Sequence, residues 1–162
     1  YIDVGACDGD TTNPFIKDFE RVVAFEPNIE VFNKISDDAE KYNLGLGAKD
    51  EVVQIVLPNG IEHPEHGSIT RFNTEEWEDR PRFNITIKRL DDFKFTNVDL
   101  IKIDVEHYEM NVCLGAEETI KQYKPVVMFE NKRNEADHVL SWFKDLGYKI
   151  DKRKSDTVAY YE

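Results

Sequence analysis

A short apolar stretch in the second half of the chain carries three charged side chains at alternating positions. Residues 99–106 read Asp-Leu-Ile-Lys-Ile-Asp-Val-Glu, and such alternation is typical of a β-strand. The pattern places Lys102, Asp104 and Glu106 on one face and apolar side chains on the other. A strand covered on both faces buries charges only when they are paired or used. The stretch therefore predicts an ion-pair cluster around Lys102, a functional site with Asp104 or Glu106, or both.

A glycine-containing turn follows the first apolar segment. Residues 3–9 read Asp-Val-Gly-Ala-Cys-Asp-Gly, and the glycines allow a sharp turn and a close approach to a ligand. Glu26 ends the second apolar segment, 21 positions after Gly5. An acid about 20 residues beyond such a turn commonly binds the ribose hydroxyls of an adenosine. The candidate residues for binding an adenosine cofactor are Asp3, Gly5, Ala6, Asp8, Gly9 and Glu26.

The spacing and charge of this turn discriminate between adenosine cofactors. A dinucleotide usually requires G-x-G-x-x-G, whereas here three residues separate Gly5 from Gly9. Asp3 and Asp8 flank the turn with negative charge, which would repel a pyrophosphate. A cationic sulfonium does not meet that repulsion, so the turn favours S-adenosylmethionine over NAD or FAD.

The elements that must position these residues alternate between strand-length apolar runs and helix-like stretches. The expected strands are residues 1–4, 21–26, 42–46, 52–57, 84–90, 99–105, 125–130, 148–150 and 157–161. One helix is expected to begin at residues 11–14, and three more are expected over approximately residues 28–41, 108–122 and 135–146. Residues 58–82 form a long irregular stretch, and such loops are often functional. This order predicts an α/β fold with a parallel sheet covered on both faces.

Composition narrows the classes of partner. The 162 residues suffice for one domain, 1–162, and Tyr1 opens inside an expected strand, so we expect an N-terminal segment to be missing. Acidic residues outnumber basic ones by 33 to 21, a net charge of −12 that disfavours nucleic acid or an anionic membrane. No apolar run approaches the ~20 residues of a transmembrane helix. Cys7 and Cys113 make neither a disulfide framework nor a zinc set, which favours a reducing, cytoplasmic location.

Three segments of the chain together resemble the FkbM-type methyltransferase family. They are Asp3-x-Gly5-Ala6-x-x-Gly9-Asp10-Thr11, Ala24-Phe25-Glu26-Pro27-Asn28 and the block from Asp99 to Glu109. Residues 89–92, 115–116 and 125–130 also resemble that family, so the likeness covers most of the chain. The resemblance implies the class I methyltransferase fold, a Rossmann-like sheet of seven strands with the last antiparallel and helices on both faces. It also implies methyl transfer from S-adenosylmethionine to a hydroxyl of a sugar or natural product, and hence a small-molecule or glycan acceptor.

Further donor-binding candidates follow from this resemblance. Pro27 and Asn28 complete the motif around Glu26. Asn43 lies where an adenine contact often occurs in this fold, although a solvated turn residue is the alternative. Ser68 resembles part of a family loop that lies over the donor, with a simple loop serine as the alternative.

The chain departs from the family pattern at one position. The family has Glu-Gly-x-Glu where this sequence has His107 after Glu106. The imidazole could narrow the acceptor pocket, supply a base, or accompany a changed substrate. This departure bears most on the identity of the acceptor.

The acceptor hydroxyl must lose a proton, so a general base is expected near the carboxyl edge of the sheet. The candidates are Glu106, Asp104, His107 and Glu130, of which we favour Glu106, with Asp104 positioning the donor or the base. As an alternative, Asp104, Glu106 and Glu130 could hold a divalent ion that polarises the hydroxyl. Two other functions stay open: a Rossmann-like NAD-binding oxidoreductase, and a catalytically silent adenosyl-binding domain.

Overall fold

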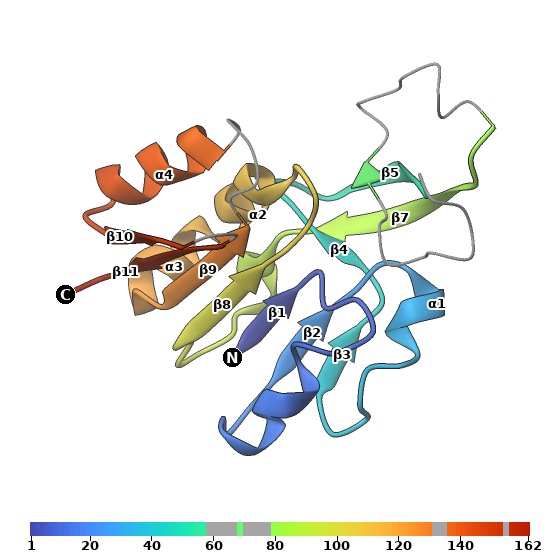
Figure 1. Ribbon diagram of the computed structural model, residues 1–162, viewed down its shortest axis with the longest axis horizontal. Coiled ribbons are helices and arrows are strands. Elements are labelled where there is room, and N and C mark those ends of the chain that lie inside the picture. The colour runs from blue at the N-terminus through green and yellow to red at the C-terminus, as the bar shows by residue number, and fades with distance from the viewer. Residues whose placement is uncertain (58–67, 70–78, 131–135, 154–155) are drawn as a thin grey trace.

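A mostly parallel seven-stranded sheet forms the centre of the protein. The computed structural model describes residues 1–57, 68–69, 79–130, 136–153 and 156–162 (Figure 1). The strand order is β10-β11-β9-β8-β1-β2-β3. The bounds are β1 Ile2–Val4, β2 Val23–Phe25, β3 Glu40–Tyr42, β8 Leu100–Ile103, β9 Val126–Glu130, β10 Lys149–Lys152 and β11 Asp156–Tyr160. All neighbouring pairs are parallel except those of β11, which runs antiparallel to β9 and β10. This confirms the predicted fold class and its antiparallel last strand.

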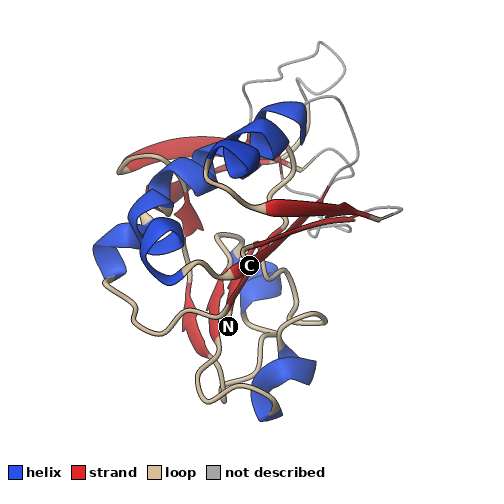
Figure 2. Ribbon diagram, turned by 90° about the vertical axis from the view of Figure 1, so that its left-hand side faces the viewer, coloured by secondary structure: helices blue, strands red, loops and turns tan. Residues whose placement is uncertain are grey.

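Side-chain alternation along the short central strands divides the core into two layers. Ile2 and Val4 of β1 belong to the larger cluster, which also contains Ile101 and Ile103 of β8. Ala24 of β2 belongs to a smaller cluster on the opposite face. Helices lie on both sides of the sheet (Figure 2). The larger layer is covered by α2 Glu109–Gly115, α3 Glu117–Tyr123 and α4 Ala136–Asp145, and the smaller by the 3₁₀ helix η1 Asn13–Lys17 and by α1 Ile29–Phe32.

Two expected helices are shorter than predicted. The helix expected over residues 28–41 ends at Phe32, and beyond it the Ser36 N–H donates to the Asn13 side chain (3.1 Å) instead of to the Phe32 carbonyl. The helix expected over residues 108–122 is divided at Gly115. A Cβ at Gly115 would lie 1.9 Å from the Gly47 carbonyl oxygen, so two segments of main chain meet there.

A second, smaller sheet was not predicted. Its order is β4-β7-β5-β6, with bounds β4 Gly45–Leu46, β5 Glu51–Val56, β6 Ser68–Ile69 and β7 Arg82–Lys88. The strand expected over residues 42–46 is therefore wrong as one element, because its residues end β3 and form β4 in different sheets. The second sheet has its own small core of Ile55, Ile85 and Ile87. The Tyr108 hydroxyl, which donates to Glu51 (3.0 Å), joins this sheet to the segment after β8.

Asp91 in the 3₁₀ helix η4 (Leu90–Phe93) closes the N-terminus of α3. Its buried carboxylate accepts hydrogen bonds from the N–H groups of Glu118 and Thr119 and from the Thr119 hydroxyl. Arg89 pairs with the same carboxylate at 3.1 Å. These contacts hold α3 against the larger core and give the 89–92 segment a structural role. Across the described part of the chain, no helix has the length and apolar character needed to cross a membrane.

Candidate active site at the carboxyl edge of the sheet

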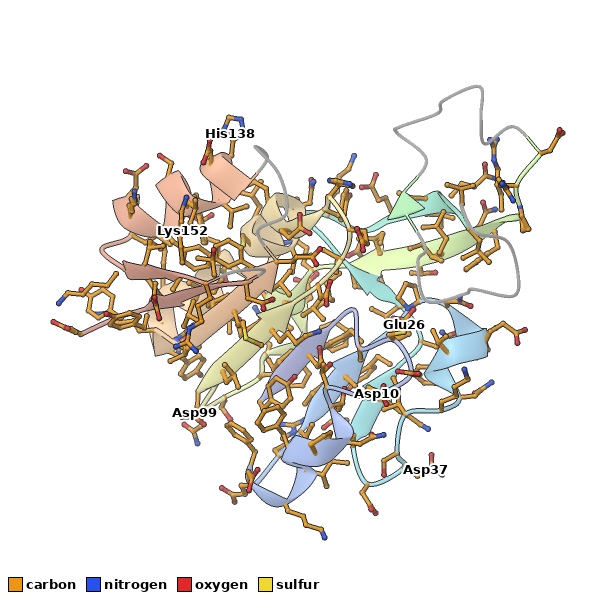
Figure 3. All side chains as sticks on the ribbon, viewed as in Figure 1. Asp10, Glu26, Asp37, Asp99, His138 and Lys152 are labelled. Atoms are coloured by element: carbon orange, nitrogen blue, oxygen red, sulfur yellow. The ribbon has the colours of Figure 1, made fainter. Side chains whose placement is uncertain are left out.

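The parallel strands β1, β2, β8 and β9 bring their carboxyl ends to one edge of the sheet. Ligands of open α/β sheets bind at this edge. In Figure 3, Glu26 lies at this edge beside α1, whereas Asp99 lies at the opposite end of the sheet. Asp10 marks the loop after β1 (Figure 3). The predicted turn, the predicted ribose-binding acid and the charged segment therefore meet in one region.

Gly5 makes the turn after β1 possible. Its φ is +80°, and a Cβ at this position would lie 1.9 Å from the main-chain oxygen of Asp104. The N–H groups of Gly5 and Ala6 both donate to the carbonyl oxygen of Phe25, at 2.9 and 3.1 Å. Only glycine combines this backbone angle with this close approach. The turn thus joins the ends of β1, β2 and β8.

The second half of the turn is also built on positive φ angles. Cys7 and Gly9 have φ of +52° and +88°. The Asp8 carboxylate accepts a long hydrogen bond from the Asp10 N–H (3.4 Å). The helix that follows is the five-residue η1, whose N-cap residue Thr12 makes no side-chain cap. Such a short 3₁₀ helix supplies little of the N-terminal dipole with which dinucleotide folds hold a pyrophosphate.

Glu26 connects the loops that follow β1 and β2. One carboxylate oxygen accepts a hydrogen bond from the Cys7 N–H (2.9 Å) and the other from the Asn28 N–H (2.7 Å). Glu26 is only 7% exposed, and this burial raises the pKa of its carboxyl group above the ordinary value, although both N–H groups oppose the rise. Each carboxylate oxygen can accept more than one hydrogen bond. The group can therefore also receive the hydroxyls of a ribose.

Asn28 and Asn43 fix the backbone around Glu26. The Asn28 side chain accepts from the Glu30 N–H (3.1 Å) and caps α1. The Asn43 amide donates to the carbonyl oxygens of Glu26 (2.9 Å) and Pro27 (3.0 Å). Asn43 thus holds the turn in place, and its contact with an adenine stays a prediction.

Lys102 is held between two carboxylates, which confirms the predicted ion-pair cluster. Its ammonium lies 3.4 Å from Asp3 and 3.3 Å from Asp104. Asp3 is fully buried and also accepts hydrogen bonds from the hydroxyls of Thr11 (3.0 Å) and Thr12 (2.8 Å). Burial lowers the pKa of Lys102, but the two carboxylates outweigh this and leave the pKa raised. Through these bonds Asp3 supports the turn. The part that the Thr11 and Thr12 hydroxyls take in this support was not predicted from the sequence.

Three of the predicted acceptor-side residues come together beyond β8 and at the end of β9. Carboxylate oxygens of Asp104, Glu106 and Glu130 all lie within 4.8 Å of one another. The sequence placed Glu106 inside the strand, which is wrong, because β8 ends at Ile103 and Glu106 has φ of +45°. The backbone nevertheless turns Glu106 back toward Asp104. Oxygen donors at such separations suit a hard divalent cation as well as a proton-transfer role.

His107 occupies a backbone conformation that favours glycine. Its φ is +70°, directly after the positive φ of Glu106. This explains why glycine at this position is the pattern of the family that the sequence resembles. The His107 N–H donates to the Glu109 carboxylate (3.2 Å). Burial raises the pKa of the Glu109 carboxyl group.

The remaining candidate, Ser68, lies in β6, where its backbone pairs with Val56. Its side chain lies outside the described residues, so its predicted contact with the donor stays a prediction.

The arrangement as a whole fits S-adenosylmethionine better than a dinucleotide. Glu26 can accept hydrogen bonds from a ribose, and Gly5 allows a ligand to approach closely. The carboxylates of Asp104, Glu106 and Glu130 would attract a sulfonium and repel a pyrophosphate.

Comparisons with known proteins agree with this geometry. A family model described as the methyltransferase FkbM domain matches residues 3–150. A solved methyltransferase FkbM from Methylobacillus flagellatus KT is similar with a TM-score of 0.68 and 18% identity, covering 99% of this chain and 42% of that one. An rRNA methylase from Streptococcus thermophilus has a TM-score of 0.57 and 12% identity, covering 99% and 86%. This chain thus spans less than half of the FkbM structure, and no curated protein matches its sequence significantly.

Replacing Gly5 by alanine should disrupt the site and the fold together. The new Cβ would meet the Asp104 carbonyl, so we expect Gly5→Ala to lower the free energy of unfolding by more than about 3 kcal/mol. Gly147→Ala is the matched control: φ there is +85°, but the nearest atom, in the Tyr161 ring, is 3.4 Å away. That variant should lose only about 1 kcal/mol from backbone strain. Urea denaturation measures both, and equal losses would refute the role of the contact.

Proposed function

The chain belongs to the methyltransferase FkbM family, and from this premise we propose that it transfers a methyl group from S-adenosylmethionine to a hydroxyl of a sugar or small natural-product acceptor. The observation that carries the proposal is the carboxylate of Glu26, which is held by the N–H groups of Cys7 and Asn28. It lies in the same region as the Gly5 turn. This is the arrangement that an adenosine with a free ribose requires.

The residues proposed to bind the donor lie in the loops after β1, β2 and β3 and in β6. Gly5, Ala6, Asp8 and Gly9 form the turn that lies against the donor, while Asp3 supports it from below. Glu26 binds the ribose hydroxyls. Pro27, Asn28, Asn43 and Ser68 complete the candidate donor-binding set.

Acceptor chemistry is assigned to the segment after β8 and to the end of β9. When bound, S-adenosylmethionine supplies an activated methyl group on a sulfonium whose departure leaves a neutral thioether. The protein must align the acceptor oxygen and remove its proton. Glu106 is the proposed base, Asp104 is held by Lys102 for positioning, and Glu130 and His107 border the same region.

The charge of the chain supports a small-molecule or glycan acceptor rather than nucleic acid. A net charge of −12 and the carboxylates at the site repel a phosphate backbone. The likeness to an rRNA methylase concerns the fold. Two cysteines, Cys7 and Cys113, are too few for a disulfide framework, and this supports a cytoplasmic location.

Binding of the donor is the first test of this proposal. S-adenosylhomocysteine or S-adenosylmethionine at 100 times its dissociation constant should add about 2.7 kcal/mol of stability. For a domain of this size, that raises the melting temperature by roughly 5–10 °C. NAD in parallel should produce no shift. A shift with NAD alone would favour the oxidoreductase, and a shift with none of the three would overturn the proposed donor.

The affinity for S-adenosylhomocysteine should depend on the protonation of Glu26. Ribose hydroxyls favour the ionised carboxylate, so affinity should fall as the pH drops through the raised pKa of Glu26. Glu26→Ala should weaken binding at neutral pH by roughly 10- to 100-fold and remove this dependence. Glu30→Ala, which removes an exposed acid of α1, should preserve both the affinity and its pH dependence. Calorimetric titration at several pH values measures this, and an unchanged affinity of Glu26→Ala would refute the assignment.

Replacing Glu106 separates proton transfer from donor binding. Glu106→Gln should reduce methyl transfer to a panel of hydroxylated glycans by roughly 10²- to 10⁴-fold and leave donor affinity near that of the wild type. Transfer of a labelled methyl group measures the rate, and normal turnover would contradict the proposed base.

Treatment with a chelator distinguishes a general base at Glu106 from a divalent ion held by the three carboxylates. If Asp104, Glu106 and Glu130 act through a divalent ion, EDTA abolishes wild-type transfer and added Mg²⁺ restores it. If Glu106 acts as the base, EDTA has no effect. Methyl transfer to any acceptor would also exclude the catalytically silent domain.

A further inference from the structure

Lys102 holds an unusual position among the basic residues. Among the residues that the structure describes, it is the one lysine or arginine that is buried. It lies on the sheet face that carries Asp3, one strand away in β1, and reaches Asp104 beyond the end of its own strand. A buried ammonium is costly unless it is paired, and here it is paired twice.

The two carboxylates that hold Lys102 face different surroundings. Asp3 is fully buried and is also bound by Thr11 and Thr12, so its charge is fixed inside the protein. The side chain of Asp104 is 42% exposed and lies beside Glu106 and Glu130. Lys102 therefore connects the interior beneath the donor turn to the carboxylates at the acceptor side.

The charge of Lys102 also reaches the proposed ribose site. It lowers the pKa of Glu26, whereas Asp3 raises it, after the larger effect of burial. Lys102 thus acts electrostatically on Glu26 on one side and on Asp104 on the other. With Lys102, the group Asp3, Asp104, Glu106 and Glu130 carries three formal negative charges, and without it four.

We infer that Lys102 is a positioning residue that holds Asp104 in place and limits the negative potential at the methyl-transfer end of the site. The inference rests on the proposed function, because it concerns the charge of the donor. S-adenosylmethionine carries a sulfonium, whereas the product S-adenosylhomocysteine carries a neutral thioether in its place. A negative site favours the donor over the product, and a cation beside Asp104 reduces this preference. Lys102 therefore sets how strongly the site distinguishes the donor from the product.

The ratio of the two dissociation constants tests this role separately from any effect on folding. Lys102→Met should shift the ratio toward S-adenosylmethionine by roughly three- to tenfold, because the positive charge that pairs with Asp104 is removed. Lys102→Arg, which keeps the charge, should stay near the wild-type ratio. Lys121→Met removes an exposed lysine that pairs with Glu117 in α3, and it should leave the ratio unchanged. Calorimetric titration with both ligands gives the ratios.

A double-mutant cycle keeps the test decisive if Lys102→Met does not fold. Asp104→Asn should shift the ratio away from S-adenosylmethionine, and Lys102→Met in that background should shift it back. The double variant retains the net charge of the wild-type pair and avoids a second unpaired carboxylate. Lys102→Met, in the wild type or in Asp104→Asn, could instead change the affinities for S-adenosylmethionine and S-adenosylhomocysteine equally. That result would show that Lys102 has only a structural role and would overturn the inference. Failure of the wild type to bind either ligand would instead overturn the proposed function, and the inference with it.

Discussion

The contact between Gly5 and the main chain of Asp104 is the constraint on which the candidate site depends. The ends of β1 and β8 approach each other so closely that a single Cβ at Gly5 would overlap the Asp104 carbonyl. The approach is fixed by hydrogen bonds on both sides, from the Asp104 N–H to Val4 (2.9 Å) and from Gly5 to Phe25 (2.9 Å). The turn at Gly5 and the acids that follow β8 therefore meet at one junction of main chain.

Charge is distributed around this junction in a consistent way. Asp3, Glu26, Asp104, Glu106 and Glu130 all lie within or beside it, while Lys102 offsets part of their charge from inside. Such a concentration of carboxylates is costly unless each is hydrogen-bonded, paired or used. Asp3 and Glu26 are held by hydroxyl or N–H donors, and Asp104 is paired with Lys102. The acids at the acceptor side keep the larger share of solvent exposure, which is where a cationic or hydroxylated ligand would arrive.

The sequence predicted the parts of this protein that depend on local patterns. Strand-length apolar runs predicted the parallel strands, and Gly5 and Glu26 predicted the turn and the acid beside it, because each of these signals lies in the few residues that form or end one strand. The second sheet could not be predicted, since it depends on the pairing of β4 with β7, in which each residue lies 42 positions from its partner. Glu106 was misplaced because its positive φ and that of His107 end the strand, and no side-chain pattern marks such angles in non-glycine residues. The division of the long helix at Gly115 likewise reflects a tertiary contact with Gly47.

The separate core of the second sheet has an evolutionary consequence. Ile55, Ile85 and Ile87 pack mainly among themselves and with Val53 and Phe83, while Leu46 is buried in the core of the main sheet. Substitutions at Val53, Ile55, Phe83 or Ile85 therefore alter a cluster with its own packing, whereas Glu51 is excluded because it binds Tyr108 in the segment after β8. A lineage can in this way change the packing of the second sheet while it keeps the contact between Gly5 and Asp104. Residues that can vary and residues that hold the Gly5 contact thus belong to different hydrophobic cores of one chain.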